Sequence, residues 1–282
     1  MIPWINFNGK FYRADAYLLG VNNRAFCYGD ALFETMRWHD KKILFFHDHV
    51  DRLFSGMQFL KMKIPKKYSA AFLQNQVYEL IRRKNITSDA RIRLQVFRNE
   101  GGYYTPTDNS VQFVIAAESI RNDNYVLNEK GITLDIFSEL QKSKHRLSNF
   151  KTSNCLIYVL AGIFAKENKI DDCLILNTDG NIADSISSNI FLLKNETLIT
   201  PPLADGCVDG LMRKNILRMC LKKKIKTEEK SIQVNTLLEA DEILLTNVIQ
   251  GIRGVKQFRE INYKNDFSKF LSREINFLGP LN

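Results

Sequence analysis

The 282-residue sequence has little cysteine and no motif of paired cysteines. Its five cysteines stand far apart in the chain, at Cys27, Cys155, Cys173, Cys207 and Cys220. An odd number without any C-x-x-C pair argues against a disulfide framework and against a zinc site. The pattern is typical of reduced thiols and therefore favours a cytoplasmic protein.

Long apolar stretches are also missing. No run approaches the roughly 18–20 apolar residues that a membrane-spanning helix needs. The opening MIPWINFNGKFYRAD is not a charged leader followed by an apolar stretch, so it does not resemble a secretory signal. There is no internal repeat and no low-complexity tract. These absences predict a soluble, intracellular protein that does not insert into a membrane.

The charge is basic but dispersed. The 40 Lys and Arg residues outnumber the 31 Asp and Glu residues, which gives a formal net charge of +9. The densest run is only Lys222–Lys224, and no basic helix interleaved with aromatic residues is present, which argues against nucleic-acid binding. An ordinary solvated basic surface explains the balance, and anionic small substrates are the next possibility.

The sequence does have ample material for a core, since 45% of its residues are hydrophobic and 11% aromatic. The length favours one or two domains. Period-two and helical spacings of apolar residues, together with an Asn-Gly turn, predict the elements of the first half. These are a hairpin of Ile2–Phe7 and Lys10–Tyr12 around Asn8-Gly9, helices over His47–Lys61 and about 73–81, and strands at Arg91–Val96 and Val111–Ala117.

A polar stretch separates this half from the second. It predicts a smaller N-terminal α+β domain over 1–117, a linker over 118–131 and a larger C-terminal domain over 132–282. The second half is expected to hold strands at Ile132–Phe137, Cys173–Asn177, Ile190–Leu193 and Ile243–Thr246, and helices at Asn154–Glu167, Leu211–Lys223 and Val234–Ala240. Because strands and helices mix without regular βαβ alternation, the sequence favours an α+β fold over a doubly wound sheet.

Four segments combine polar side chains in a pattern that suggests chemistry. They are Tyr28–Thr35 followed by His49–Leu53; Phe150–Asn154; Gly180–Phe191; and Thr200–Pro202 followed by Asp205–Arg213. Phe150–Asn154 places a lysine at the entry of an apolar helix, and Gly180–Phe191 places an acid and short polar residues before a strand. The last segment is a glycine-containing loop that opens a helix, where free backbone N–H groups bind anions.

In this order the segments resemble the class IV aminotransferases, the fold-type IV enzymes that use pyridoxal 5′-phosphate (PLP). The resemblance runs from Tyr28 to about Val255. The family includes branched-chain and D-amino acid aminotransferases and 4-amino-4-deoxychorismate lyase. It implies a two-domain fold like that of D-amino acid aminotransferase, with the site between the domains. It also implies a homodimer in which a loop of the neighbouring subunit completes each site.

The resemblance assigns the catalytic roles to two residues. Lys151, in the second domain, stands where the family has the lysine that forms the Schiff base with PLP and moves the proton at the substrate Cα. Asp184 stands where the family has a glutamate that pairs with the pyridine nitrogen and makes the ring an electron sink. The aspartate arm is one methylene shorter, and a turn-capping role for Asp184 is the alternative.

The same resemblance implies a set of residues that bind the cofactor. Arg52 and the backbone N–H groups of Leu211 and Met212 would hold the phosphate, although the family usually has threonine where this chain has Met212. A solvent-facing helix position is the alternative for Arg52. Asn247 and Val248 fall where relatives have a second phosphate loop, and Val248 offers an N–H but no hydroxyl. Ser187 and Ser188 would line the cofactor or serve as turn residues.

Several further positions complete the predicted site. Cys155 stands where many relatives carry a tyrosine, and we assign it to packing only. The His47 and His49 pair has no third ligand at a suitable spacing, so we expect no metal there. The candidate substrate contacts come from the first domain and are Tyr28, Phe33, Arg98, Tyr103 and Tyr104.

The predicted activity is transfer of an amino group between a small amino acid and a 2-oxo acid. The alternative is 4-amino-4-deoxychorismate lyase, which releases pyruvate and leaves 4-aminobenzoate. The compact length and the segments Phe33–Arg37 and Arg98–Tyr104 resemble that branch. A more remote alternative is a binding protein that kept the fold and lost the chemistry. The changes at Asp184 and Met212 motivate it, whereas the retention of Lys151 argues against it.

Overall fold

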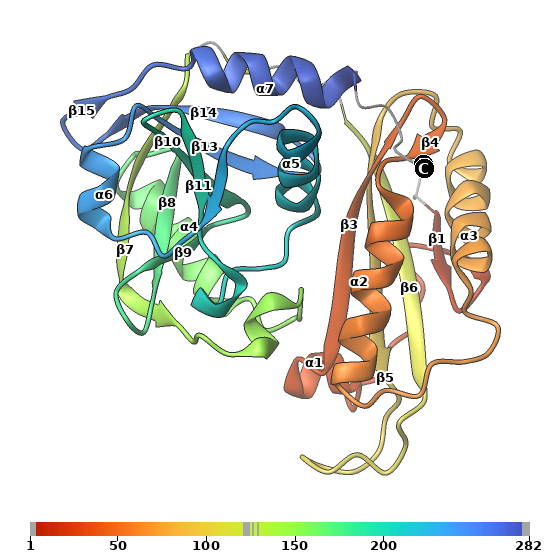
Figure 1. The fold of residues 1–282 in the computed structure, drawn as a ribbon. Coiled ribbons are helices and arrows are strands. Elements are labelled where there is room, and N and C mark those ends of the chain that lie inside the picture. The colour runs from red at the N-terminus through yellow and green to blue at the C-terminus, as the bar shows by residue number, and fades with distance from the viewer. Residues whose placement is uncertain (1–3, 121–124, 126, 129, 278–282) are drawn as a thin grey trace. The chain divides into compact units, whose positions relative to one another are not determined.

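The structure is a computed structural model that describes residues 4–120, 125, 127–128 and 130–277 (Figure 1). Contacts divide these residues into two units. The first contains 4–120 and Phe150–Asn154, and the second contains the described residues of 125–149 together with 155–277. No helix in the described part is long and apolar enough to cross a membrane.

The first unit is a six-stranded antiparallel sheet with two long helices on one face (Figure 1). The strand order is β2-β1-β6-β5-β3-β4. The strands are β1 (Trp4–Phe7), β2 (Lys10–Arg13), β3 (Ala31–His39), β4 (Lys42–Ile43), β5 (Ala90–Arg98) and β6 (Val111–Ser119), and the helices are α1 (Arg24–Tyr28), α2 (Phe46–Phe59) and α3 (Ala70–Arg83).

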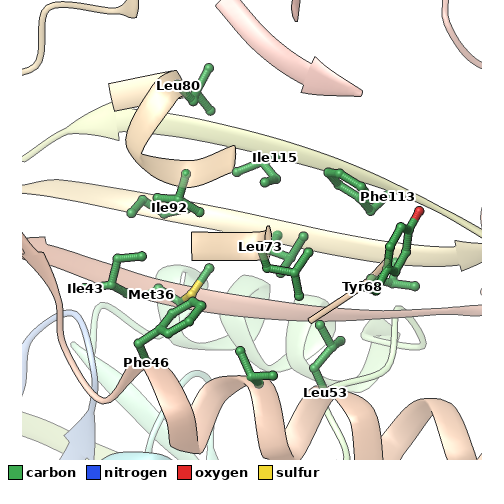
Figure 2. Close-up of a cluster of buried hydrophobic side chains, with 14 of the residues drawn as sticks. Met36, Ile43, Phe46, Leu53, Tyr68, Leu73, Leu80, Ile92, Phe113 and Ile115 are labelled. Carbon is green, nitrogen blue, oxygen red and sulfur yellow. The ribbon is translucent and has the colours of Figure 1, made fainter. Parts of the chain in front are cut away.

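The helices cover the sheet because their apolar residues recur on one side, as the sequence predicts. Figure 2 shows Phe46 and Leu53 of α2, and Leu73 and Leu80 of α3, gathered with strand residues that alternate towards the same face. Those strand residues are Met36, Ile92, Phe113 and Ile115. The result is one buried core for this unit.

The second unit is a mixed sheet with the strand order β12-β11-β10-β13-β14-β7-β8-β9, and β15 pairs with β14. Its strands are β7 (Ile132–Lys142), β8 (Asp172–Asn177), β9 (Ile182–Ser185), β10 (Asn189–Lys194), β11 (Thr197–Thr200), β12 (Thr227–Glu229), β13 (Glu242–Asn247), β14 (Gly251–Phe258) and β15 (Ile261–Asn262). Its helices are α4 (Leu156–Glu167), α5 (Leu211–Lys222), α6 (Val234–Leu238) and α7 (Asp266–Phe277), with 3₁₀ turns η1 (Arg146–Asn149) and η2 (Leu203–Asp205).

Two parallel crossovers, β7-α4-β8 and β11-α5-β12, lie among mostly antiparallel pairs, so the fold is α+β, as the sequence predicts. The predicted hairpin is confirmed over Trp4–Arg13, with Asn8 and Gly9 at φ values of 54° and 87°. Ile2 and Pro3 lie outside the described residues. The strand predicted to end at Phe137 continues to Lys142, past an irregular register with β8.

The division into units differs from the predicted domains in two ways. The predicted linker 118–131 includes residues outside the described part, but β6 already occupies positions up to Ser119. The structure also groups Lys151 with the first unit, whereas the sequence predicted it in the second domain. The reason is that 151–153 pairs with the start of β3. Phe33 N donates to Lys151 O at 2.9 Å, and Ser153 N donates to Ala31 O at 2.9 Å.

Candidate functional site

Lys151 is held on the first unit by its own backbone. An isolated bridge between Thr152 and Leu32 continues the pairing of this segment with β3. The Lys151 Nζ lies 4.7 Å from the centre of the Phe33 ring, and the Arg93 guanidinium carbon lies 3.8 Å from the same centre. Lys151 is half-buried. The sequence therefore places an amine beside an aromatic ring on a fixed strand edge.

Arg52 lies in a buried polar cluster on α2. Its Nε and Nη2 donate to the two carboxylate oxygens of Glu34 at 2.8 and 2.5 Å, and His49 Nδ1 lies 2.6 Å from the same carboxylate. Burial raises the pKa of Glu34, but Arg52 and His49 more than offset this and hold it at about 2. Burial lowers the pKa of His49, against the opposing effect of Glu34. Arg52 is thus fixed by a carboxylate and is not a solvent-facing residue.

The five candidate substrate contacts lie in different surroundings. Phe33 is the one beside Lys151. The Tyr28 ring lies 5.7 Å from the Tyr104 ring, and both Tyr103 and Tyr104 are exposed, on the connection between β5 and β6. Arg98 is buried, and its guanidinium donates to Asp30, Asn109 and backbone carbonyls. These groups hold the Arg98 guanidinium in place, and its contact with substrate stays a prediction.

In the second unit, Asp184 stands at the centre of a polar network. It lies on β9 opposite Ile175 of β8. Its Oδ2 accepts from Lys142 Nζ at 2.6 Å and from the Tyr158 hydroxyl at 3.2 Å. Its Oδ1 accepts from Asn189 Nδ2 at 3.1 Å, and the N–H of Val208 reaches both oxygens. Asp184 is therefore far more than a turn cap.

This network reaches the beginning of α5. Asn189 Nδ2 also donates to Val208 O at 2.8 Å. Asn189 Oδ1 lies so close to Gly210 that a Cβ there would overlap it. Gly210 is the N-cap of α5 and supplies no side-chain cap, so the first N–H groups of the helix, those of Leu211 and Met212 among them, have no acceptor within the helix. Such a helix start suits an anion.

A separate set of hydrogen bonds lies at the end of β13 and in the turn that follows it. Asn247 Oδ1 accepts from the N–H groups of Ile249 and Gln250, and Asn247 Nδ2 donates to Ser188 Oγ at 3.0 Å. The neighbouring Thr246 hydroxyl is buried and has no partner within the part of the chain that the structure describes. Ser188 is buried, whereas Ser187 is exposed.

The remaining predicted positions have simpler surroundings. The side chains of Met212 and Val248 are apolar and buried, so each residue can offer a ligand only its backbone groups. Cys155 precedes α4 and makes no side-chain cap. His47 is exposed while His49 is buried, and the described residues contain no group of three metal-ligating side chains.

Sequence reasoning missed Lys142 and Tyr158, the two donors to Asp184 Oδ2. Neither carries a motif. Lys142 precedes Asp184 by 42 positions and meets it only because β7 and β9 flank β8. Tyr158 reads as one more core residue of an apolar helix. An apolar strand that runs on into a lysine is the one weak signal that was available.

The family model described as amino-transferase class IV matches residues 31–258. The chain therefore belongs to the class IV aminotransferase family.

Individual relatives carry both of the family's activities in their names. A probable branched-chain-amino-acid aminotransferase of Aquifex aeolicus is 29% identical over 260 residues, covering 88% of this chain and 82% of the relative. An aminodeoxychorismate lyase of Bacillus subtilis is 22% identical over 264 residues, covering 92% of this chain and 88% of the relative. Among solved structures, the branched-chain amino acid aminotransferase of Escherichia coli superposes with a TM-score of 0.88 at 22% identity, covering 99% of this chain and 95% of that one. This last likeness shows the fold, which is that of fold-type IV enzymes.

Proposed function

We propose that this protein is a PLP-dependent aminotransferase that moves an amino group between a small amino acid and a 2-oxo acid, with Lys151 as the residue that holds the cofactor. The observation that carries the proposal is the family match over 31–258, which contains Arg52, Lys151, Asp184 and the beginning of α5. Because the chain retains a lysine at position 151, we do not favour the alternative of a catalytically inactive binding protein.

The residues of the structure fit PLP in charge and donor type. The uncapped start of α5 and the buried Thr246 hydroxyl would serve the phosphate, together with Asn247, the Val248 N–H and Arg52. Asp184 would hold a proton at the ring nitrogen. Ser188, buried beside Asn247, would line the cofactor, with the exposed Ser187 next to it in the chain.

When bound, PLP supplies an electron sink for the bonds at the substrate Cα. The chain supplies the proton transfer and the environment. Lys151 would take the proton from Cα and return it. Its amine can act as the base, and its backbone is fixed by pairing with the start of β3. The burial of Asp184 keeps water from its carboxylate, so this carboxylate would give the charge at the ring nitrogen a fixed partner.

The test is absorption spectroscopy of the purified protein with a panel of amino acids, with and without 2-oxoglutarate. We expect a yellow protein whose spectrum changes on addition of a small amino acid and recovers on addition of the oxo acid. A colourless protein that takes up no added PLP would contradict the proposal.

The second candidate is the lyase, which the similarity to the Bacillus subtilis protein favours. It predicts pyruvate release from aminodeoxychorismate with no requirement for an oxo acid. A lactate dehydrogenase-coupled assay of pyruvate distinguishes this activity from amino transfer.

We also propose that the protein is a homodimer. One side of α4 supports this, because Leu156, Val159, Leu160 and Ile163 recur at helical spacing and are 76%, 53%, 40% and 47% exposed. A second copy of the chain would cover this row, in keeping with the dimers that the family resemblance implies. None of the five cysteines is in a disulfide within the part of the chain that the structure describes, which suits a reducing compartment, and we propose the cytoplasm.

A further inference from the structure

The contact between Lys142 and Asp184 is the closest that the Asp184 carboxylate makes. The ammonium lies 2.6 Å from Oδ2, and the two side chains are only 8% and 3% exposed. The Lys142 Nζ also lies 5.4 Å from the centre of the Tyr158 ring. Tyr158 is itself a hydrogen-bond partner of Asp184, so its ring lies beside the Lys142 ammonium. A buried pair of this kind is fixed in position, because breaking it would leave a charge without compensation.

The carboxylate has little capacity left. A carboxylate offers about four lone-pair directions, and Lys142, Tyr158, Asn189 and Val208 already donate to it. A ring N–H would therefore share an oxygen with one of these donors. The Tyr158 hydroxyl is the longest of the side-chain contacts, at 3.2 Å, and can rotate away, whereas the ammonium of Lys142 stays with its charge partner.

Two titratable groups beside this pair, Tyr158 and Cys207, are neutral near pH 7. Burial, and then the negative charge of Asp184, raise the pKa of Tyr158 well above its ordinary value. The same two causes raise the pKa of Cys207 to about 12. Arg213 and Asp209 act on Cys207 with opposite signs. Lys142 is therefore the cation in contact with Asp184 among the described residues.

From this geometry we propose that Lys142 is a positioning residue for the reaction: it fixes the Asp184 carboxylate on the β7 side and shares the negative charge that this carboxylate presents to the ring nitrogen of the cofactor. The inference rests on the proposed function.

The competition has a direction that can be measured. The Lys142 charge disfavours a proton on the ring nitrogen, both directly and by occupying Asp184. Removing it should let the ring nitrogen keep its proton to higher pH. At separations typical of neighbouring buried groups, loss of one charge should raise the midpoint of the ring-nitrogen titration by about one pH unit.

The experiment follows the ¹⁵N resonance of ring-labelled PLP bound to the protein as the pH is varied. The variants are Lys142→Met and Lys142→Arg, with Lys144→Met as the matched control, because Lys144 is a more exposed lysine paired with Asp179. We expect a higher midpoint in Lys142→Met, and a midpoint close to that of the wild type in Lys142→Arg and Lys144→Met. Where Lys142→Met does not fold, Lys142→Gln keeps a donor for Asp184 without the charge and gives the same test.

A second measurement needs no cofactor. Thermal unfolding of Lys142→Met, Asp184→Asn and the double variant, without added PLP, should show that the double variant recovers part of the midpoint lost in the single variants. Strictly additive losses would contradict the pairing.

The outcomes separate the two claims. A loaded wild-type protein whose ring-nitrogen curve is the same in Lys142→Met overturns the inference about Lys142 and leaves the proposed function standing. If the titration curves of the wild type and Lys142→Met are identical and show no midpoint in the accessible pH range, the inference about Lys142 is likewise overturned. A wild-type protein that takes up no PLP overturns both.

Discussion

Arg52 is attached to Glu34 through two hydrogen bonds, so its guanidinium is oriented before any ligand arrives. An arginine fixed in this way binds a phosphate with little loss of side-chain entropy. Arg52→Ala should weaken PLP binding by about 10–100-fold, or about 1.5–3 kcal/mol. Fluorescence titration of the protein with PLP measures this. Arg82→Ala, which removes an exposed arginine of α3, should leave the affinity unchanged.

The Arg52 variant also leaves Glu34 with one cation fewer, so stability must be measured beside affinity. A folded Arg52→Ala protein with wild-type affinity for PLP would show that the arginine serves only the Glu34 cluster.

Asp184→Asn tests the acid at the ring nitrogen. The amide has nearly the shape of the carboxylate, and the phosphate contacts and Lys151 would still hold the cofactor, so loading should change little. The chemical step should slow on the order of 100-fold or more, because the charge on the ring develops only as Cα loses its proton. Single-turnover spectroscopy with a reactive amino acid measures the rate constant. Conversion at the wild-type rate would assign Asp184 a purely structural role.

The structure adds a stability cost to this substitution, since Lys142 would keep a buried charge without its partner. Breaking such a pair costs about 3–5 kcal/mol. Asp184→Glu restores the usual acid of the family but adds a methylene where four donors already surround the carboxylate. We expect it to be no faster than the wild type.

At the scale of elements, the position of α5 depends on Gly210. Its φ of −73° suits any residue, so the glycine is required by the close approach of Asn189 and not by backbone strain. Gly210→Ala should push the helix start away from Asn189 and cost about 1–3 kcal/mol. Denaturant unfolding gives the stability, and PLP titration should show a parallel loss of affinity.

Gly162→Ala is the matched control, because this glycine lies within α4 and an added Cβ would meet only Ile186, at 3.9 Å. It should be neutral or stabilise by up to about 1 kcal/mol, as expected for alanine in place of glycine in a helix. Equal losses in both variants would mean that Gly210 has no special contact.

The sequence predicted the elements whose periodicity is regular. α2, α3 and α5 were found within three residues of their bounds because their apolar residues recur every three or four positions. α4 begins at Leu156, two residues later than predicted, because Cys155 is its N-cap, with φ −107° and ψ 11°.

Other elements carried no such signal. β3 was missed because each of its two faces carries both polar and apolar side chains between Leu32 and Trp38, so the sequence does not alternate. β14 was missed because glycines begin and interrupt it. At the site, motif residues could be named one by one, but the donors Lys142 and Tyr158 meet Asp184 through strand order and helix packing, which a single sequence does not specify.

At the scale of the whole molecule, stability should fall in acid because of the Glu34 cluster. The folded pKa of Glu34, about 2, lies below its ordinary value of 4.5, so its contribution is complete above pH 4.5 and is lost as the pH falls towards 2. The size is about 3 kcal/mol. The lowered pKa of His49 acts in the same direction, with loss beginning below its ordinary 6.5.

Urea unfolding at a series of pH values measures this dependence. Glu34→Gln should be less stable than the wild type at pH 7 but should lose less stability between pH 4.5 and 2. Parallel curves for the two proteins would show that Glu34 is not the group responsible.

Association is the second property at this scale. Light scattering after size exclusion should give twice the chain mass of 32.7 kDa. Val159→Lys, in the middle of the exposed row on α4, should shift the protein to the monomer, because a charge would be buried in the proposed contact. Leu221→Lys, at another exposed apolar position, should remain a dimer. A dimer that survives Val159→Lys would place its contact elsewhere.

We propose that Lys151 carries the cofactor, and chemical trapping with borohydride can identify the lysine that does so. The PLP-loaded protein is reduced with borohydride, digested and mapped by mass spectrometry. We expect a pyridoxyl group on the peptide that contains Phe150–Asn154 and no label on Lys142, whose amine is paired with Asp184. Label on Lys142 or on any lysine other than Lys151 would contradict it.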